Sequence, residues 1–270
     1  MSAGLTRGLG LFVNWPRALA VVGACAIAIA VVPFVVGPFV LHVLTIGAYY
    51  VILCVSWNLL AGFTGQFSLA QHAFAGVGAY TSGLLILHLK VPLWVSMPAG
   101  VAMAALAGYV LGRLVLKMRA IYLSIATWAF AETFRIWLGA AFDFTRGDLG
   151  LSVPSLFGSL KTSAYFYTFS GTALATALLA YVLLKSPAGF FMRGVKDDEM
   201  RANALGVDTT GVKIFAFVLS SAMAGLAGVL YAHYVLTLTP GYVDFSEMAK
   251  VIMMVVIGGL GTFIGPILAA

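Results

Sequence analysis

The chain has 270 residues, of which 62% are hydrophobic and only 9% are charged. A typical soluble domain is about 45–50% apolar and about 25% charged, so this chain could not cover its own core with polar surface. A soluble globular protein is therefore excluded. More than half of the 30 glycines lie within apolar runs, as they do in transmembrane helices, which is not the pattern of a disordered chain.

Eight apolar stretches are long enough to be membrane-spanning helices, because a span needs about 20 apolar residues. In chain order they cover residues 18–36, 39–60, 73–89, 94–115, 120–140, 163–184, 212–236, and a last stretch from 248 to the chain end. The sequence predicts an all-α, polytopic transmembrane helical bundle of about eight spans, which forms a single domain over residues 1–270.

The formal net charge of +6 comes from basic residues that gather at span ends, so membrane orientation explains it better than nucleic-acid binding. With a cytoplasmic N-terminus, ten Lys and Arg residues fall in cytoplasmic segments. Four, including Lys250, fall in outer segments, and Arg135 lies within a span. Because Lys and Arg are enriched in cytoplasmic loops, the bias predicts that the N-terminus is cytoplasmic.

Two connections differ from ordinary loops. Residues 61–72, with the polar side chains of Gln66, Ser68 and Gln71, should be cytoplasmic, yet they contain no Lys or Arg. Irregular backbone at membrane depth is tolerated only where it is buried in protein or lines a cavity. The second connection is the run Gly258-Gly259-Leu260-Gly261 inside the last apolar stretch, where glycine weakens a helix.

We expect both connections to be broken or re-entrant segments along a translocation path, because paired Gly-interrupted segments point to transporter binding sites. The alternative is that small residues there let neighbouring helices approach closely.

Glu132 and Arg135 lie three residues apart within one span, so they share a helix face and can form an ion pair. This pair either faces the translocation path or is structural, buried between helices or snorkelling towards the outer end.

The longest charged loop covers residues 185–211, and the stretch 196–206 within it has the marks of a short helix. Asp197 or Asp198 can cap its free N–H groups, and Gly206 is placed to end it. A helix of about two turns is marginal alone in water, so it needs a surface to pack on.

The apolar side chains of this short helix form a small knob surrounded by charges, and they are Met200, Ala204 and Leu205. Such a knob suits insertion into a groove on a cytoplasmic partner. The alternative is a helix that rests on the membrane surface or on its own bundle.

The sequence contains no metal-ligand constellation and no phosphate-cradling G-x-x-x-x-G-K-[ST] motif. We therefore expect no metal site, no cofactor and no ATP hydrolysis by this chain.

Seven short motifs run from residue 58 to the chain end. They are Asn58 to Leu69 (NLLAGFTGQFSL), Phe74 to Tyr80 (FAGVGAY), Phe130-Ala131-Glu132, Asp197-Asp198-Glu199, Ala204 to Asp208 (ALGVD), Ala224 to Gly228 (AGLAG) and Gly258 to Thr262 (GGLGT). On these motifs the sequence resembles the permease subunits of ABC importers for branched-chain amino acids, in the subgroup of the M-type permease.

The resemblance implies a multi-pass protein of the bacterial plasma (inner) membrane that pairs with a sister permease subunit. It also implies two cytoplasmic ATP-binding subunits and a periplasmic solute-binding protein. The loop 185–211 would be the coupling element that docks on an ATPase, through Asp197, Asp198, Glu199, Met200, Ala202, Ala204, Leu205 and Gly206. Of the broader importer motif Glu-Ala-Ala-x-x-x-Gly, only Ala202 and Gly206 fit.

The family continues beyond the run at 258–261 by one or two helices, so we expect C-terminal helices of the family to be missing from this chain. The same resemblance extends to importers of urea and short-chain amides, which leaves the solute open.

A proton-coupled secondary transporter with Glu132 as a proton relay is an alternative of another class. A membrane-embedded enzyme would need a second convergent acid, base or metal site, which the sequence lacks.

Overall fold

The computed structural model describes residues 15–115, 118, 120–158 and 162–270. Some basic residues counted for the orientation, Arg7, Lys117, Arg119 and Lys161, lie outside the described residues. The long helices are α2 (Trp15–Val35), α3 (Pro38–Trp57), α4 (Gln71–Leu89), α5 (Leu93–Val115), α6 (Ala120–Ala140), α8 (Thr162–Lys185) and α11 (Thr209–Val235). Each coincides with one of the first seven predicted spans to within a few residues, which confirms an all-α, polytopic helical bundle.

Short elements connect these helices. They are η1 (Asn58–Gly62), α7 (Phe142–Thr145), η2 (Gly147–Leu149), α9 (Pro187–Asp197), α10 (Glu199–Ala204), η3 (Pro240–Val243), α12 (Phe245–Gly258) and α13 (Gly265–Ala269). The strands β1 (Leu151–Ser152) and β2 (Thr237–Leu238) form one antiparallel pair, with Leu151 opposite Leu238. This pair ties the connection after α6 to the end of α11.

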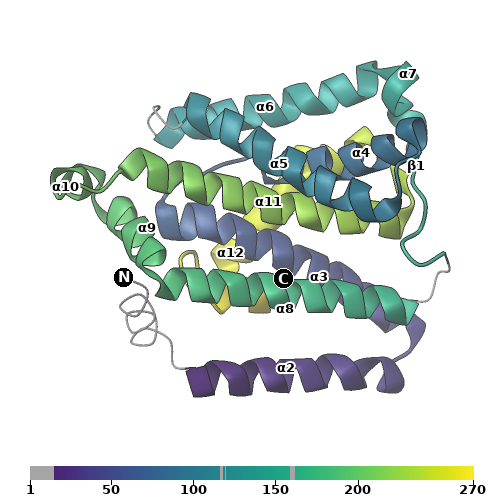
Figure 1. Ribbon diagram of the computed structural model, residues 1–270, viewed down its shortest axis with the longest axis horizontal. Coiled ribbons are helices and arrows are strands. Elements are labelled where there is room, and N and C mark those ends of the chain that lie inside the picture. The colour runs from purple at the N-terminus through teal and green to yellow at the C-terminus, as the bar shows by residue number, and fades with distance from the viewer. Residues whose placement is uncertain (1–14, 116–117, 119, 159–161) are drawn as a thin grey trace.

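Five helices among the described residues are long and apolar enough to cross a membrane, with α3 and η1 counted as one span. They are Pro38–Gly62, Gln71–Leu89, Leu93–Val115, Thr162–Lys185 and Thr209–Val235. The predicted number of eight crossings stays a prediction. In Figure 1 the long helices run side by side, with α9 and α10 at one end of the bundle and α7 and β1 at the other.

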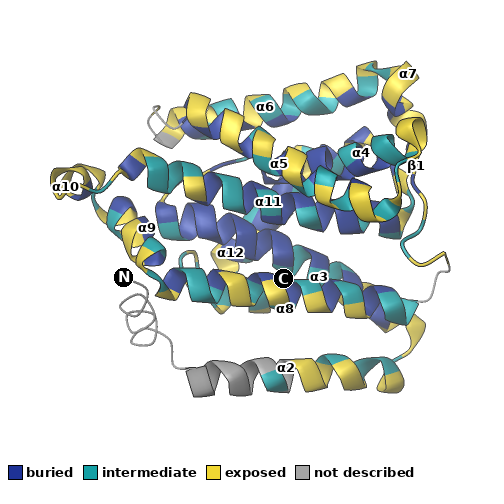
Figure 2. Ribbon diagram, in the orientation of Figure 1, coloured by how far each residue is buried: buried dark blue, intermediate teal, exposed yellow. Residues whose placement is uncertain are grey.

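The core lies along α3, α4 and α11, where much of the dark blue in Figure 2 lies. Glycines let α4 and α11 touch through their backbones, since a Cβ at Gly78 would lie 2.6 Å from the carbonyl oxygen of Gly225. Such contact between small residues holds helices together where lipid removes most of the hydrophobic driving force. Helix α2 lies beside α8 at the periphery, and most of its described residues are exposed.

The last predicted span, from residue 248 to the chain end, begins as α12, and the break that the sequence predicted inside it is present. Helix α12 has 14 residues and is about 21 Å long, which is too short for a hydrocarbon core about 30 Å thick. It ends at Gly258, and a turn of residues 259–264 leads to the five-residue α13. Gly261 has a φ of +81°, which favours glycine, so the turn cannot continue the helix.

Candidate functional site

The predicted break after α3 is present. Residues 65–70 are not helical, and η1 before them is a π-helical turn that extends α3. Side chains satisfy the exposed backbone groups: Trp57 donates to the carbonyl of Ser68 over 2.7 Å, and the N–H of Leu69 donates to Thr127 Oγ1 of α6 over 3.0 Å. The irregular backbone of residues 65–70 thus lies between α3, α4 and α6. Hydrogen bonds from these helices offset the free-energy cost of burying its unpaired N–H and C=O groups.

The three polar side chains predicted along this segment have different surroundings. Gln71 is buried and its amide nitrogen donates to Ser56 Oγ over 2.6 Å and to Ser220 Oγ over 3.1 Å, so it joins α3, α4 and α11. Ser68 is buried, and its hydroxyl accepts from the N–H of Ala70. Gln66 is 5% exposed, and neither atom of its side-chain amide has a hydrogen-bond partner among the residues that the structure describes. A buried amide without partners is costly, so Gln66 is the member of this set that a ligand or a rearrangement would satisfy.

The second predicted break, at Gly258 and Gly259, lies directly against the first. Asn58, the first residue of η1, donates to the carbonyl of Thr262 over 2.7 Å and accepts from the N–H of Gly261 over 2.9 Å. One side chain therefore clamps both broken segments. The sequence predicted each break, but nothing in it predicted that they touch, because the two partners are more than 200 residues apart.

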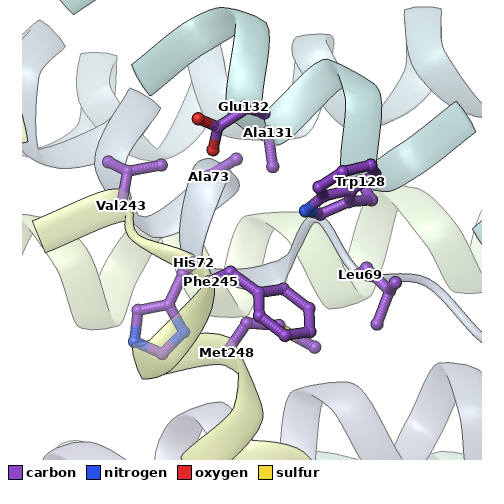
Figure 3. A pocket seen from close by; sticks show the side chains of 9 residues that line it. All are labelled: Leu69, His72, Ala73, Trp128, Ala131, Glu132, Val243, Phe245 and Met248. Atoms are coloured by element: carbon purple, nitrogen blue, oxygen red, sulfur yellow. The ribbon is translucent and has the colours of Figure 1, made fainter. Parts of the chain in front are cut away.

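Glu132 and Arg135 form the predicted ion pair, with Arg135 Nε donating to Glu132 over 3.0 Å. Their side chains are 31% and 34% exposed, so the pair is not sealed between helices of this chain. Beside Glu132 lies a cavity of about 10 Å³, room for about one water molecule, which His72, Trp128 and Phe245 help to line (Figure 3). His72 is buried, and its Nδ1 has no hydrogen-bond partner within the described part of the chain.

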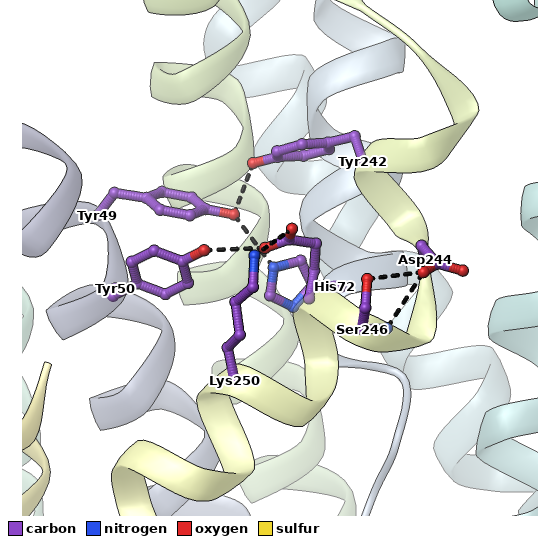
Figure 4. Close-up of polar contacts among 8 residues, drawn as sticks. Tyr49, Tyr50, His72, Tyr242, Asp244, Ser246 and Lys250 are labelled. Atoms are coloured by element: carbon purple, nitrogen blue, oxygen red, sulfur yellow. Dashed lines mark hydrogen bonds and ion pairs between the residues drawn. The ribbon is translucent and has the colours of Figure 1, made fainter.

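A second ion pair, between Glu247 and Lys250 on α12, was missed. Lys250 Nζ lies 2.6 Å from Glu247, and Tyr50 donates to the same carboxylate over 2.8 Å (Figure 4). Tyr50 is at the midpoint of the 25-residue span Pro38–Gly62, and Lys250 lies on α12 rather than in a loop. The orientation count, which assigned Lys250 to an outer segment, stays a prediction.

Aromatic residues surround this second pair. Tyr242 donates to the hydroxyl of Tyr49 over 2.6 Å, and Tyr49 lies 3.5 Å from His72 Nε2. The ring of Tyr231 lies 4.7 Å from the rings of both Tyr49 and Tyr242, measured between centroids. The result is a polar and aromatic cluster beside the middle of the span Pro38–Gly62, between α3, α4, α11 and η3. Among the residues that the structure describes, no group of three His, Cys, Asp or Glu side chains is arranged to hold a metal ion.

The charged loop contains two helices where one was predicted. Asp198 has extended backbone, so α9 ends before it and α10 begins after it, and its side chain accepts from the N–H of Arg201 over 3.0 Å. The predicted cap is confirmed in Asp198, whereas Asp197 is the last residue of α9. Gly206, with a φ of +85°, ends α10 in the way predicted.

The knob of α10 is exposed at the surface of the bundle. Met200 and Leu205 are 83% and 84% exposed, and Ala204 is exposed as well, whereas Ala202 is buried against the chain. Glu199 holds the helix to α11 through an ion pair with Lys213 of 2.5 Å. Helix α10 lies at one end of the bundle (Figure 1), and two large exposed apolar side chains there are what a docking helix requires.

The family model for the permease component of the branched-chain amino acid transport system matches residues 39–270. The chain belongs to this family. It is 32% identical to the high-affinity branched-chain amino acid transport system permease protein LivM of Escherichia coli K12, over 88% of this chain and 63% of that protein. It therefore spans less than two thirds of the length of LivM.

More distant relatives include the permease protein LivH of E. coli K12, 24% identical over 82% of this chain and 78% of LivH. The autoinducer 2 import system permease protein LsrC of Shigella flexneri is 28% identical over 83% of this chain and 66% of LsrC. No solved structure matches the chain. The resemblance read from the sequence motifs is thus confirmed at the level of the family.

Proposed function

We propose that this chain is a transmembrane permease subunit of an ATP-driven importer, in which it forms part of the translocation path and docks on a cytoplasmic ATP-binding subunit. The observation that carries the proposal is the exposed knob of α10, with Met200 and Leu205 uncovered at the end of a bundle of this family. A two-turn helix with an apolar tip gains its stability from a partner. Residues 185–211 are the coupling loop in this account.

The complete importer contains, in this proposal, a sister permease subunit, two ATP-binding subunits and a periplasmic solute-binding protein in the bacterial inner membrane. The end of the bundle with α9 and α10 is cytoplasmic, and so is the N-terminus. Basic residues at that end, such as Arg113, Lys185 and Arg193, support this orientation. The chain is not an enzyme, because ATP is hydrolysed by its partners.

The translocation path runs along the side of the chain formed by α6, η3 and α12. Support comes from the two ion pairs, Glu132 with Arg135 and Glu247 with Lys250, whose side chains are between 26% and 46% exposed. A charge facing lipid near the bilayer centre costs at least about 2.5–3.5 kcal/mol, so this side is covered by the sister permease or by water in the path. The breaks at Gln66, Ser68 and Gly258–Gly259 line its cytoplasmic half.

Branched-chain amino acids are the proposed solute, by relation to LivM and LivH. The ion pairs at half-depth support a zwitterion over urea or an amide, because an ammonium and a carboxylate exchange readily with a Lys–Glu or Arg–Glu pair. The side chains beside Glu132, among them Trp128, Phe245 and Met248, are apolar, and in this proposal they contact a branched aliphatic side chain once the cavity of about 10 Å³ widens.

Purification of the solubilised chain, co-expressed with the sister permease and ATP-binding subunits of its own operon, tests the assembly. We expect all subunits to elute as one complex in stoichiometric amounts. Elution of the chain without an ATP-binding subunit would contradict the proposal. Titration of the operon's solute-binding protein with leucine, valine and urea then tests the solute class, and tight binding of urea alone would contradict an amino-acid importer.

A further inference from the structure

A lysine in the coupling loop reaches from α9 to the broken segments in the bundle. Lys196 lies in the last turn of α9, and its Nζ donates to the carbonyl of Gly62 over 2.7 Å. Gly62 is the last residue of η1, where the carbonyls at a helix end carry partial negative charge and attract a cation. The aliphatic part of Lys196 covers Gly65, where an added Cβ would lie 3.3 Å from Lys196 Cγ.

The same ammonium lies beside the second break. A Cβ built on Gly261 would lie 3.1 Å from Lys196 Nζ and 3.0 Å from the carbonyl oxygen of Gly62. Asn58 completes the junction through its hydrogen bonds to Gly261 and Thr262. Three segments far apart in the sequence thus meet at Lys196: the end of η1, the turn after α12 and the end of α9.

The surroundings of this contact are open rather than packed. A cavity of about 270 Å³ lies between the first broken segment and the coupling loop, and Thr64, Gln66, Lys196, Glu199 and Lys213 are among its lining residues. The unpartnered amide of Gln66 belongs to this segment. Because this space is open, the contacts of Lys196, its hydrogen bond to Gly62 and its stem over Gly65, are the direct link between the end of α9 and the first break.

We infer that Lys196 is a positioning residue for coupling, which transmits movement of the docking helix α10 to both broken segments. Asp198 begins α10 two residues after Lys196, so the docking helix and the lysine share one short piece of chain. When α10 moves with an ATP-binding subunit, the charge-assisted bond pulls Gly62, and the Asn58 clamp carries the turn at Gly261 with it. This inference rests on the proposed function, because it needs an ATP-binding subunit at α10.

The test uses the complete importer in proteoliposomes, with wild type, Lys196→Met, Lys196→Arg and the matched control Lys185→Met from the same loop. Methionine keeps the stem over Gly65 but removes the ammonium. We expect Lys196→Met to retain the ATP-binding subunits and basal ATP hydrolysis, while leucine uptake per ATP falls about tenfold, within the range of measured couplings. Lys196→Arg recovers part of the coupling, and Lys185→Met behaves as wild type.

Uptake per ATP at the wild-type level in Lys196→Met would overturn the inference and leave the proposed function intact. Failure of the wild-type complex to bind ATP-binding subunits would instead overturn the proposed function. Should Lys196→Met not assemble, spin labels at Asp197 and Leu260 of an otherwise wild-type complex decide the question. A label distance that is unchanged between nucleotide-free and ATP-bound states supports linked movement, and a change of about one helical turn, 5 Å, would overturn it.

Discussion

Asn58 and Gly261, 203 positions apart in the sequence, are joined by a hydrogen bond of 2.9 Å that connects the two interrupted segments of the bundle. The other end of the same amide donates to the neighbouring carbonyl of Thr262 over 2.7 Å. One side chain therefore satisfies both a donor and an acceptor of a turn that no helix supports. In a membrane protein such groups have little water to replace a lost partner.

Replacement of Asn58 by Ala is expected to lower the stability of the solubilised chain by about 1–3 kcal/mol, because the Gly261 N–H and the Thr262 carbonyl lose their partner. The measurement is the free energy of unfolding in detergent and denaturant. Asn203→Ala is the control, since Asn203 is exposed on α10. Equal stability of the two variants would show that the clamp contributes nothing.

Replacement of Gly206 by Val is expected to uncouple ATP hydrolysis from transport. Gly206 has a φ of +85°, where a β-branched residue is strained, so the end of α10 and the direction of its knob must change. We expect uptake per ATP to fall about tenfold or more in the reconstituted importer. Gly206→Asn should retain most of the coupling, because Asn tolerates this backbone conformation. Equal loss of coupling in Gly206→Asn and Gly206→Val would show that the backbone conformation at Gly206 is not what coupling depends on.

Replacement of Leu205 by Asp is expected to weaken binding of the ATP-binding subunit without loss of stability. Leu205 is 84% exposed, so its replacement removes almost no buried surface from the folded chain and leaves the free energy of unfolding nearly unchanged. In an interface with the ATP-binding subunit the same side chain is buried, and its replacement by Asp weakens the free energy of binding by about 2 kcal/mol or more. Co-purification measures binding, and thermal unfolding of the isolated chain measures stability. Leu205→Met is the matched control, and unchanged binding in Leu205→Asp would assign α10 to the membrane surface instead.

Replacement of Glu132 by Ala is expected to reduce solute uptake, because it leaves Arg135 without its partner at membrane depth and removes a carboxylate from the proposed path. The double variant Glu132→Ala with Arg135→Ala separates the two effects. If the pair lines the path, uptake stays low in the double variant although its expression recovers. Full recovery of uptake would show that the pair is only structural.

The sequence predicted the elements that depend on local properties. The apolar stretch at 120–140 coincides with α6 (Ala120–Ala140), and the one at 94–115 lies within one residue of α5 (Leu93–Val115). The cap at Asp198 and the end at Gly206 were predicted for the same reason, since both depend on residues within one or two turns. The breaks were visible as glycine and uncharged polar residues.

Contacts between distant segments were not predictable in this way. The clamp of Asn58, the bond from Lys196 to Gly62 and the contact of Tyr50 with Glu247 all join residues more than 130 positions apart. Periodicity and propensity describe neighbours along the chain, and they contain no information on which loop meets which helix. The length of α12 and the shape of the turn after it also depend on packing.

The central claim is that this chain serves an ATP-driven importer rather than a transporter that works alone. Leucine uptake into proteoliposomes that contain the complete complex tests it most directly, with ATP and a proton uncoupler as the variables. The account predicts uptake that requires ATP, the solute-binding protein and this chain, and that an uncoupler leaves unchanged. Uptake by this chain alone, without ATP and abolished by the uncoupler, would contradict it.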